Sequence, residues 1–390
     1  MRYRRIFTIV VDSFGIGQDP EAERFKDAGA NTFLHIYQSQ QGLDVPTLYA
    51  LGLGQLDHVD RTQTMGYACR LQEASNAKDT LTGHWEIMGL LTTQAPITFT
   101  EHGFPPELIH ELEKQTGRKV IGNKAASGTA ILDELGEEEI ATGHMIVYTS
   151  ADSVLQICGN EDTFGLDELY RCCEIARQIT MKPEWRVGRV IARPYVGKKR
   201  GEFVRTANRR DYALQPPQDT VLDALKEDHY DVIGIGKIHD IFSGRGLTQT
   251  LHSESSVHGM EQTTSFLDID FTGLCFTNLV DFDAKWGHRR NPAGYKNELE
   301  TFDKKLKQFI EGMRNDDLLI VCADHGNDPT YSGTDHTREL VPCLMYSPDM
   351  KKSGVLPDGR SFADIGQTIA ENFGIADRHW LGRSRLSELI

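Results

Sequence analysis

Residues 318–342 read LLIVCADHGNDPTYSGTDHTRELVP and place an apolar run directly before a loop rich in carboxylates and imidazoles. The run 318–322 has the length and the apolar, partly β-branched composition of a buried strand. Glycine and proline residues in the loop disfavour a regular helix. Within thirteen residues the loop carries five potential metal ligands or acid/base groups, which are Asp324, His325, Asp328, Asp335 and His336. The chain therefore leaves a predicted buried strand and immediately presents polar chemistry.

Three further apolar runs end in charged residues: Ile6–Val11 ends at Asp12, Tyr230–Gly236 ends at Lys237, and Leu274–Val280 is followed by Asp281 and Asp283. Helical patterns separate the runs, as in Asn297–Arg314, where apolar or aromatic residues recur on one face. Strands that alternate with helices predict an α/β fold with a doubly wound, largely parallel sheet. Ligands of such sheets gather beyond the carboxyl ends of the strands, so these polar residues are candidates for one shared site.

The middle of the chain has a different pattern. From about 98 to 213 the sequence predicts helices at 105–116 and 166–180, strands at 145–148 and 187–192, and a Gly/Ser-rich turn at 125–128. This mixture indicates an α+β cap domain inserted into the core. We expect a core made of 1–97 and 214–390 and a cap made of 98–213, and a length of 390 residues suits two domains.

The composition limits the class of protein and of partner. A formal charge of −15 argues against nucleic acid or an anionic membrane as the main partner. The seven cysteines are scattered without a CxxC pair, which favours reduced thiols and a cytoplasmic location. The apolar run near the N-terminus is too short for a secretory signal, and no stretch approaches the ~18 apolar residues that span a bilayer. We expect a soluble, intracellular protein.

The polar residues after the core strands include the donor types of a divalent-metal site. A lone aspartate after a strand often only caps a helix, and a lone histidine is usually an ordinary surface residue. The consistent placement of the whole set after predicted strands favours metal binding, and the set is too large for one tetrahedral centre, so two metals are expected. The candidates are Asp12, Asp283, His288, Asp324, His325 and His336.

Residues 78–89 read KDTLTGHWEIMG and set two threonines just ahead of a helical run. One interpretation is a threonine that only caps the helix. The other is a hydroxyl nucleophile that is deprotonated by a metal ion and set among helix N-terminal amides that suit a phosphate. Spacing alone does not distinguish Thr80 from Thr82.

Several cations lie in and beside the predicted cap. In an acidic chain, arginines at a strand end suit a phosphate, although each one alone could be a solvated surface charge. The segment TSADS at 149–153 offers hydroxyls and a carboxylate to a sugar, or it forms a plain turn. The cations are Arg189, Arg193, Arg205, Arg209, Arg210 and Lys237.

Seven motifs in this order resemble the phosphopentomutase family of the alkaline phosphatase superfamily: VVDSFGIG, KDTLTGHWEIMG, NKAASGT, YTSADSVLQI, GRVIARP, NLVDFDAKWGHRR and ADHGNDPTYSGTDHTRE. The resemblance covers nearly the whole chain, the cap included. It implies an isomerase that interconverts ribose 1-phosphate and ribose 5-phosphate, and likewise the 2-deoxyribose pair, with two Mn²⁺ ions.

Carried over by position, the resemblance implies that Thr80 is the nucleophile and is phosphorylated in the active form, which makes Thr82 a structural neighbour. It implies one metal at Asp12, Asp324 and His325 together with Thr80, and another at Asp283, His288 and His336. It implies sugar-phosphate contacts at Ser150, Asp152, Arg189, Arg205 and Lys237. Ala207 and Arg210 depart from the family pattern.

The reaction implied by the resemblance transfers a phosphoryl group from Thr80 to the bound pentose monophosphate, and Thr80 then takes back the other phosphoryl group of the 1,5-bisphosphate. A sugar bisphosphate would supply the activating phosphoryl group. The alternatives on the same core are a metal-dependent phosphatase and a cofactor-independent phosphoglycerate mutase, and a catalytically inactive metal-binding protein is the alternative from another class. The expected partners are small pentose phosphates, with no nucleic acid and no membrane, and we expect a monomer.

Overall fold

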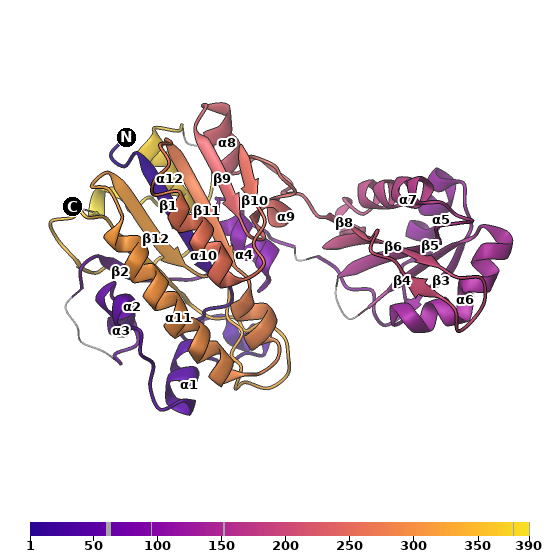
Figure 1. Cartoon of the computed structure of the whole chain (residues 1–390), viewed down its shortest axis with the longest axis horizontal. Coiled ribbons are helices and arrows are strands. Elements are labelled where there is room, and N and C mark those ends of the chain that lie inside the picture. The colour runs from indigo at the N-terminus through magenta and orange to yellow at the C-terminus, as the bar shows by residue number, and fades with distance from the viewer. Residues whose placement is uncertain (60–63, 95, 151–152, 377, 390) are drawn as a thin grey trace. The chain divides into compact units, whose positions relative to one another are not determined.

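The computed structural model describes residues 1–59, 64–94, 96–150, 153–376 and 378–389. The chain divides into two compact units (Figure 1). Unit 1 consists of Met1–Thr93 and Gln215–Ile390, and unit 2 consists of Gln94–Leu214. Each unit has its own β-sheet.

The sheet of unit 1 has the strand order β10-β9-β11-β1-β12-β13-β2-β14 among the described residues. The strands from β10 to β12 run parallel, and β13 is antiparallel to both of its neighbours. The largely parallel sheet predicted from the apolar runs is confirmed. The strands are β1 (Arg5–Val11), β2 (Tyr67–Leu71), β9 (Asp231–Ile235), β10 (Gln249–Leu251), β11 (Gly273–Leu279), β12 (Asp317–Cys322), β13 (Val341–Tyr346) and β14 (Gly354–Val355).

Two groups of helices accompany this sheet, as a doubly wound fold requires. In one group α10 and α11 pack together and α1 and α2 contact α11, while in the other α12 contacts α4 and α8, and α9 contacts α4. The helices are α1 (Thr32–Ser39), α2 (Pro46–Ala50), α3 (Leu53–Leu56), α4 (Thr80–Ile87), α8 (Val221–Glu227), α9 (Ile238–Phe242), α10 (Ser256–Ser265), α11 (Pro292–Glu311) and α12 (Asp364–Phe373), with short helical turns η1 (Ala22–Phe25), η3 (Phe282–Gly287) and η4 (Leu386–Glu388).

Helix α11 begins five residues before the predicted 297 start, because Pro292 stands in its first turn and the side chain of Asn291 caps it. Proline is well suited to the first turn, since its missing N–H would have no partner there. The Asn291 side chain accepts a hydrogen bond from the Gly294 N–H at 2.9 Å. The sequence pattern located the amphipathic part of this helix and not its capped beginning.

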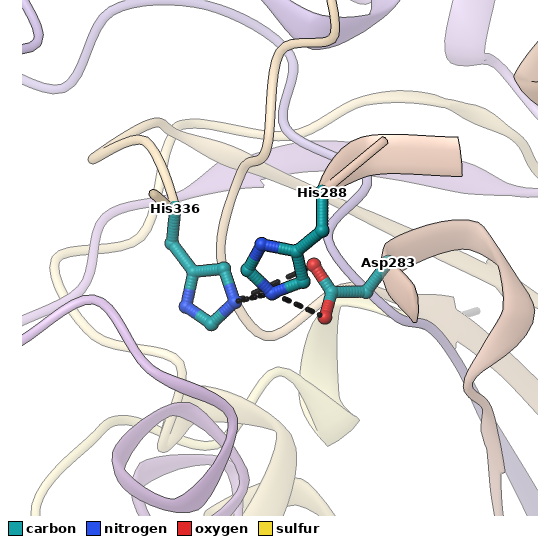
Figure 2. A group of neighbouring side chains, drawn as sticks. All are labelled: Asp283, His288 and His336. Carbon is teal, nitrogen blue, oxygen red and sulfur yellow. Dashed lines mark hydrogen bonds and ion pairs between the residues drawn. The ribbon is translucent and has the colours of Figure 1, made fainter. Parts of the chain in front are cut away.

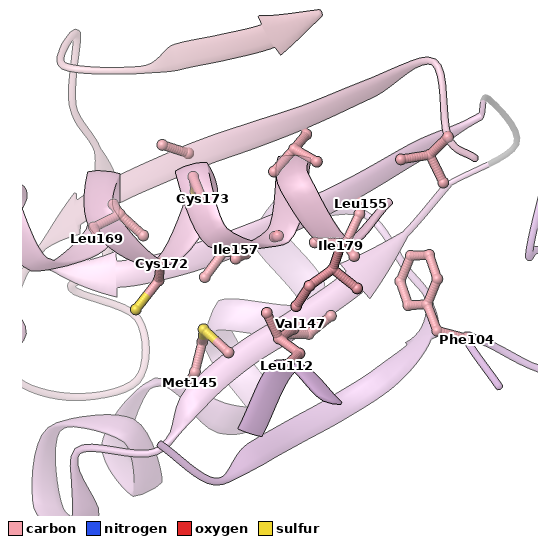
Figure 3. Close-up of a cluster of buried hydrophobic side chains, with 14 of the residues drawn as sticks. Phe104, Leu112, Met145, Val147, Leu155, Ile157, Leu169, Cys172, Cys173 and Ile179 are labelled. Carbon is pink, nitrogen blue, oxygen red and sulfur yellow. The ribbon is translucent and has the colours of Figure 1, made fainter. Parts of the chain in front are cut away.

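Unit 2 is an α+β structure with the strand order β3-β4-β5-β6-β7 and with β8 beside β6. Helices α5 and α7 pack together, and α7 also packs on β5 and β6. Their apolar side chains form a core with β4, β5 and β6, and Leu112, Val147, Ile157 and Leu169 belong to this buried cluster (Figure 3). The elements are β3 (Val120–Ala125), β4 (Met145–Thr149), β5 (Val154–Asn160), β6 (Arg189–Val196), β7 (Val204–Arg205), β8 (Arg210–Ala213), α5 (Pro106–Thr116), α6 (Gly128–Thr142), α7 (Leu166–Ile179) and the turn η2 (Pro183–Trp185).

The seven cysteines are free thiols and all are buried. No helix in the described part of the chain has both the length and the apolar character needed to cross a bilayer.

A buried ion pair joins the first residue of β1 to the first residue of β12. Arg5 is 1% exposed, and its Nε and Nη2 atoms donate to the two carboxylate oxygens of Asp317, each at 2.7 Å. The remaining Nη1 atom donates to backbone carbonyls of Phe266, Leu267 and Ile269. Each nitrogen of the guanidinium therefore has at least one acceptor.

We expect Arg5→Met to destabilise unit 1 by about 3–5 kcal/mol, because Asp317 would remain charged and buried without its partner. Arg4→Met is the matched control: the Arg4 partner Asp270 is 66% exposed, so its loss should cost less than about 1 kcal/mol. Urea unfolding of the two variants measures the difference. Equal costs for the two substitutions would contradict this account of Arg5.

Candidate functional site

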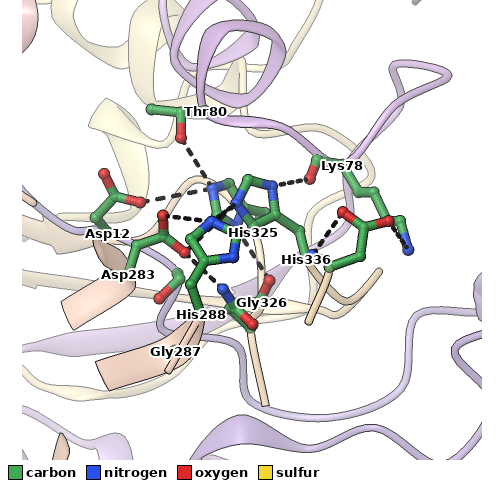
Figure 4. Close-up of polar contacts among 12 residues, drawn as sticks. Asp12, Lys78, Thr80, Asp283, Gly287, His288, His325, Gly326 and His336 are labelled. Carbon is green, nitrogen blue, oxygen red and sulfur yellow. Dashed lines mark hydrogen bonds and ion pairs between the residues drawn. The ribbon is translucent and has the colours of Figure 1, made fainter. Parts of the chain in front are cut away.

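The parallel pairing of three central strands brings the candidate ligands to one edge of the unit 1 sheet (Figure 4). Strand β1 lies between β11 and β12, with Val11 opposite Leu279 and Val10 opposite Cys322. Their carboxyl ends therefore lie at the same edge. Asp12 follows β1 directly, Asp283 lies in η3 after β11, and the 323–342 loop follows β12. Residues hundreds of positions apart are thus placed beside one another.

One group of ligand types consists of Asp283, His288 and His336, whose side chains converge (Figure 2). His288 Nε2 lies 3.2 Å from Asp283 Oδ2, and His336 Nε2 lies 3.4 Å from Asp283 Oδ1. The two Nε2 atoms are 3.1 Å apart. One carboxylate and two imidazoles therefore point their ligating atoms at a common position.

The second group is centred on His325. Its Nε2 atom lies 3.5 Å from Asp12 Oδ1, 3.4 Å from Asp324 Oδ2 and 3.2 Å from the Thr80 hydroxyl oxygen. The two groups are adjacent, because the His325 and His336 rings stack with centroids 3.9 Å apart. The structure thus gathers all six predicted metal ligands and Thr80, and their role as ligands remains a prediction.

The three histidines are held in the orientation that metal binding requires. The Nδ1 atom of each lies within hydrogen-bond distance of a backbone carbonyl: Thr334 at 2.8 Å for His288, Lys78 at 2.9 Å for His336, and Gly326 at 3.0 Å for His325. A carbonyl can only accept, so each Nδ1 carries a proton, and each Nε2 is turned toward the cluster. This is the arrangement of imidazoles that bind divalent metals.

The carboxylates of the cluster need a positive charge beside them. Burial, together with the neighbouring charges of Asp324 and Asp283, raises the pKa of Asp12 to about 8. Asp12 Oδ1 and Asp324 Oδ2 are buried and make no hydrogen bond among the described residues. Buried carboxylate oxygens without partners are costly unless a cation binds them. The donor set of oxygens and imidazoles therefore fits divalent cations.

The structure shows different contacts for Thr80 and Thr82, which sequence spacing did not distinguish. The Asp79 side chain caps α4 by accepting from the Thr82 N–H at 3.1 Å and from the Thr82 hydroxyl at 2.9 Å. Thr82 is therefore engaged in the cap, whereas the hydroxyl of Thr80 faces His325. Gly83 permits this docking, because a Cβ there would lie 2.1 Å from the carbonyl oxygen of Asp324.

The predicted sugar-phosphate residues fall in two places. Ser150, Arg189 and Arg205 line a cavity of about 340 Å³ in unit 2. Lys237 instead lies in unit 1 at the start of α9, and its charge acts to lower the pKa of Asp12. Asp152 lies outside the described residues.

The unit 2 cavity is cationic. Arg193 and Arg209 line it as well, and no carboxylate is found among its described lining residues. Arg209 is paired with Asp211 through two contacts of 2.6 and 2.7 Å, and Arg193 donates to Gln156 Oε1 at 3.0 Å. Such an arginine-lined cavity fits a phosphate ester.

Residues outside the set that the resemblance implies also contribute. Arg193 was one of the candidate cations, and its position four residues after Arg189 in β6 puts both on one face of the strand. Arg210 instead lies over the Tyr170 ring at 3.8 Å. Asn278 donates to Asp12 Oδ2 at 2.9 Å. Its position as a polar residue inside the apolar run LCFTNLV is the sequence feature that could have identified it. The Ser13 N–H donates to Asp324 Oδ1 at 3.0 Å, and a backbone contact leaves no sequence signal.

Comparison with known proteins identifies the family. The family model of the Metalloenzyme superfamily matches residues 4–377. A curated phosphopentomutase of Agathobacter rectalis is 62% identical, and one of Clostridium perfringens is 58% identical, each alignment covering 100% of both chains. The solved structure of Leishmania mexicana phosphoglycerate mutase aligns with a TM-score of 0.52 at 12% identity, covering 98% of this chain and 97% of that one, and this likeness concerns the fold alone. The chain belongs to the phosphopentomutase family, within the Metalloenzyme superfamily.

Proposed function

We propose that the chain interconverts ribose 1-phosphate and ribose 5-phosphate, and likewise the 2-deoxyribose pair, through a phosphothreonine at Thr80. The observation that carries the proposal is the position of the Thr80 hydroxyl, 3.2 Å from His325 Nε2 where the two groups of ligand types meet. Identity of 62% to a phosphopentomutase supports the class of reaction. The exact substrates and the phosphothreonine belong to the proposal.

The proposal includes two Mn²⁺ ions. Asp12, Asp324 and His325 would hold one together with Thr80, and Asp283, His288 and His336 would hold the other. When bound, divalent cations at such positions lower the pKa of the threonine hydroxyl and stabilise negative charge on the transferring phosphoryl group.

Thr80 is the residue that changes covalently in the proposed reaction. The bond from the Thr80 side-chain oxygen to phosphorus breaks while a bond from the free sugar hydroxyl oxygen to the same phosphorus forms, and the proton of that hydroxyl ends on the Thr80 oxygen. The resulting 1,5-bisphosphate then returns its other phosphoryl group to Thr80. Thr80 is the first residue of α4, where the helix N-terminus favours the negative charge of the phosphoryl group.

The arginine-lined cavity of unit 2 would bind the sugar phosphate. Ser150, Arg189 and Arg205 are the proposed contacts there, and Asp152 and Lys237 complete the proposed set. A sugar bisphosphate would phosphorylate Thr80 initially. We further propose that the chain acts on small molecules as a cytoplasmic monomer, without nucleic acid or membrane as a partner.

We expect Thr80→Ala to lower the rate of pentose phosphate interconversion by at least about a thousandfold, because the phosphoryl acceptor is removed. At saturating Mn²⁺ the metal content should stay unchanged, because three side chains remain at each proposed site, and intact mass should show a phosphate on the unsubstituted chain that the variant lacks. Thr82→Ser is the control, since it keeps the hydroxyl that donates to Asp79. Interconversion by Thr80→Ala at the rate of Thr82→Ser would remove Thr80 from the mechanism.

Removal of divalent metal should lower thermal stability, because the clustered carboxylates would lose their counter-charge. A cation present at a hundredfold excess over its Kd adds about 2.7 kcal/mol of stability. Scanning calorimetry with Mn²⁺ and with a chelator measures the change. In Asp283→Asn the stabilisation by metal should shrink, whereas Asp240→Asn, at a side chain that is 77% exposed, should retain it. No effect of metal on either variant or on the unchanged chain would contradict the metal centre.

Substrate assays separate the proposed reaction from those of other enzymes on this core. We expect turnover of ribose 5-phosphate without release of free phosphate, and no turnover of 3-phosphoglycerate. Conversion followed by ³¹P NMR detects all three outcomes in one sample. Free phosphate as the main product would indicate a phosphatase, and conversion of 3-phosphoglycerate would indicate the other mutase.

A further inference from the structure

His84 is a fully buried histidine that the proposed mechanism does not use. Its Nδ1 atom lies 2.9 Å from the backbone carbonyl oxygen of Thr80 and 3.1 Å from Asp324 Oδ2. Its Nε2 atom lies 3.2 Å from the amide nitrogen of Asn278. Both ring nitrogens are therefore engaged, Nδ1 with the backbone of Thr80 and Nε2 with Asn278 near the end of β11.

Asn278 continues the connection to the metal centre. This residue is also fully buried, and its amide nitrogen donates to Asp12 Oδ2 at 2.9 Å. The orientation of the amide is fixed chemically, because its oxygen could not donate to a carboxylate. The same amide nitrogen can then donate only to an unprotonated His84 Nε2, so the His84 proton is on Nδ1, where the Thr80 carbonyl accepts it.

The connection has a consequence for Asp12. With Oδ2 engaged by Asn278, the other oxygen, Oδ1, makes no hydrogen bond among the described residues and lies 3.5 Å from His325 Nε2. Asn278 thus holds the Asp12 carboxylate in a rotation that leaves one oxygen facing the predicted cation. Without this donor that rotation would lose its hydrogen bond.

The connection has a second consequence for Thr80. His84 follows Thr80 by four residues in α4, and its side-chain Nδ1 atom donates to the backbone carbonyl oxygen of Thr80. Gly83 meanwhile packs against the backbone of Asp324. The backbone that carries the nucleophile is therefore tied to both carboxylates of one predicted metal site.

We propose that His84 and Asn278 are positioning residues. Asn278 orients Asp12 for the cation, and His84 fixes the backbone of Thr80 relative to Asn278 and so to Asp12. The part that concerns Asp12 stands on the metal centre alone, and the part that concerns Thr80 rests on the proposed function. Neither residue touches the reacting atoms. Their substitution alters the geometry of the groups that do.

The first test removes the amide and keeps the number and branching of the side-chain heavy atoms. We expect Asn278→Leu to lower the affinity of the metal-free chain for Mn²⁺ by about 10–100-fold, as for other groups that orient metal ligands. Thr277→Val is the matched control, since Thr277 is equally buried in β11 and its hydroxyl instead faces Thr263 at 2.8 Å. Isothermal titration without substrate gives both affinities. Equal affinities in the two variants would overturn the assignment of Asn278.

The second test examines separately the contact of His84 with Asn278 and its contact with the Thr80 carbonyl. It remains available if Asn278→Leu does not fold. His84→Gln can place an oxygen where Nε2 accepts from Asn278, and His84→Asn can place an N–H where Nδ1 donates to Thr80. We expect His84→Gln to keep Mn²⁺ affinity and lose kcat with little change in KM. His84→Asn should lose Mn²⁺ affinity and keep more of its kcat at saturating metal. Equal losses of both quantities in the two variants would indicate a merely structural histidine and overturn the assignment of His84.

These readouts separate the inference from the proposed function. If the unchanged chain fails to interconvert pentose phosphates, the proposed function fails, and the Mn²⁺ affinities of Asn278→Leu and Thr277→Val still decide the assignment of Asn278. If the unchanged chain is active and these affinities are equal, the assignment of Asn278 fails and the proposed function stands.

Discussion

The rest of the site depends on the burial of several carboxylates at one edge of a parallel sheet. Asp12, Asp283 and Asp324 lie close together and are almost completely buried. Charges removed from water are costly unless an opposite charge and hydrogen bonds compensate them. Asn278 and the Ser13 N–H each donate to one carboxylate oxygen, and three imidazoles turn their Nε2 atoms toward the cluster (Figure 4). The proposed cations would supply the opposite charge.

The loop that follows β12 organises more than its ligands. Glu339 is buried and accepts hydrogen bonds from Thr32 and Thr337, which attaches the loop to the start of α1. Arg338 is buried with Glu73, and its guanidinium donates to backbone carbonyls of Glu73, Ser75 and Ala77, just ahead of Thr80. One loop therefore supplies ligands to both predicted metals and also fixes the approach to Thr80. This explains why so many polar residues follow directly after a buried strand.

The acidic composition and the cationic cavity of unit 2 are compatible. A net charge of −15 describes the whole chain, whereas a ligand responds to the charges within a few ångströms of it. Four arginines line the cavity, and Asp211 neutralises part of the charge of Arg209 and Arg189. Arg193 is held by the neutral side chain of Gln156 and so keeps its full charge. Local positive charge of this kind suits a small anionic substrate and gives no reason to expect nucleic acid.

The sequence by itself determined the strand runs, the parallel fold and the residue types at the strand ends, because periodicity and chain breaks are local properties. Resemblance to a family implied Thr80 as the nucleophile. In the structure Asp79 engages the hydroxyl of Thr82 in the helix cap, whereas the hydroxyl of Thr80 faces His325. Only the tertiary structure decided the protonated nitrogen of each histidine, the contact of Asn278 with Asp12, and the presence of Arg193 in the cavity. These features depend on which strands pair and in which register, and a side chain's partners across a sheet are not encoded in its own neighbourhood of the chain.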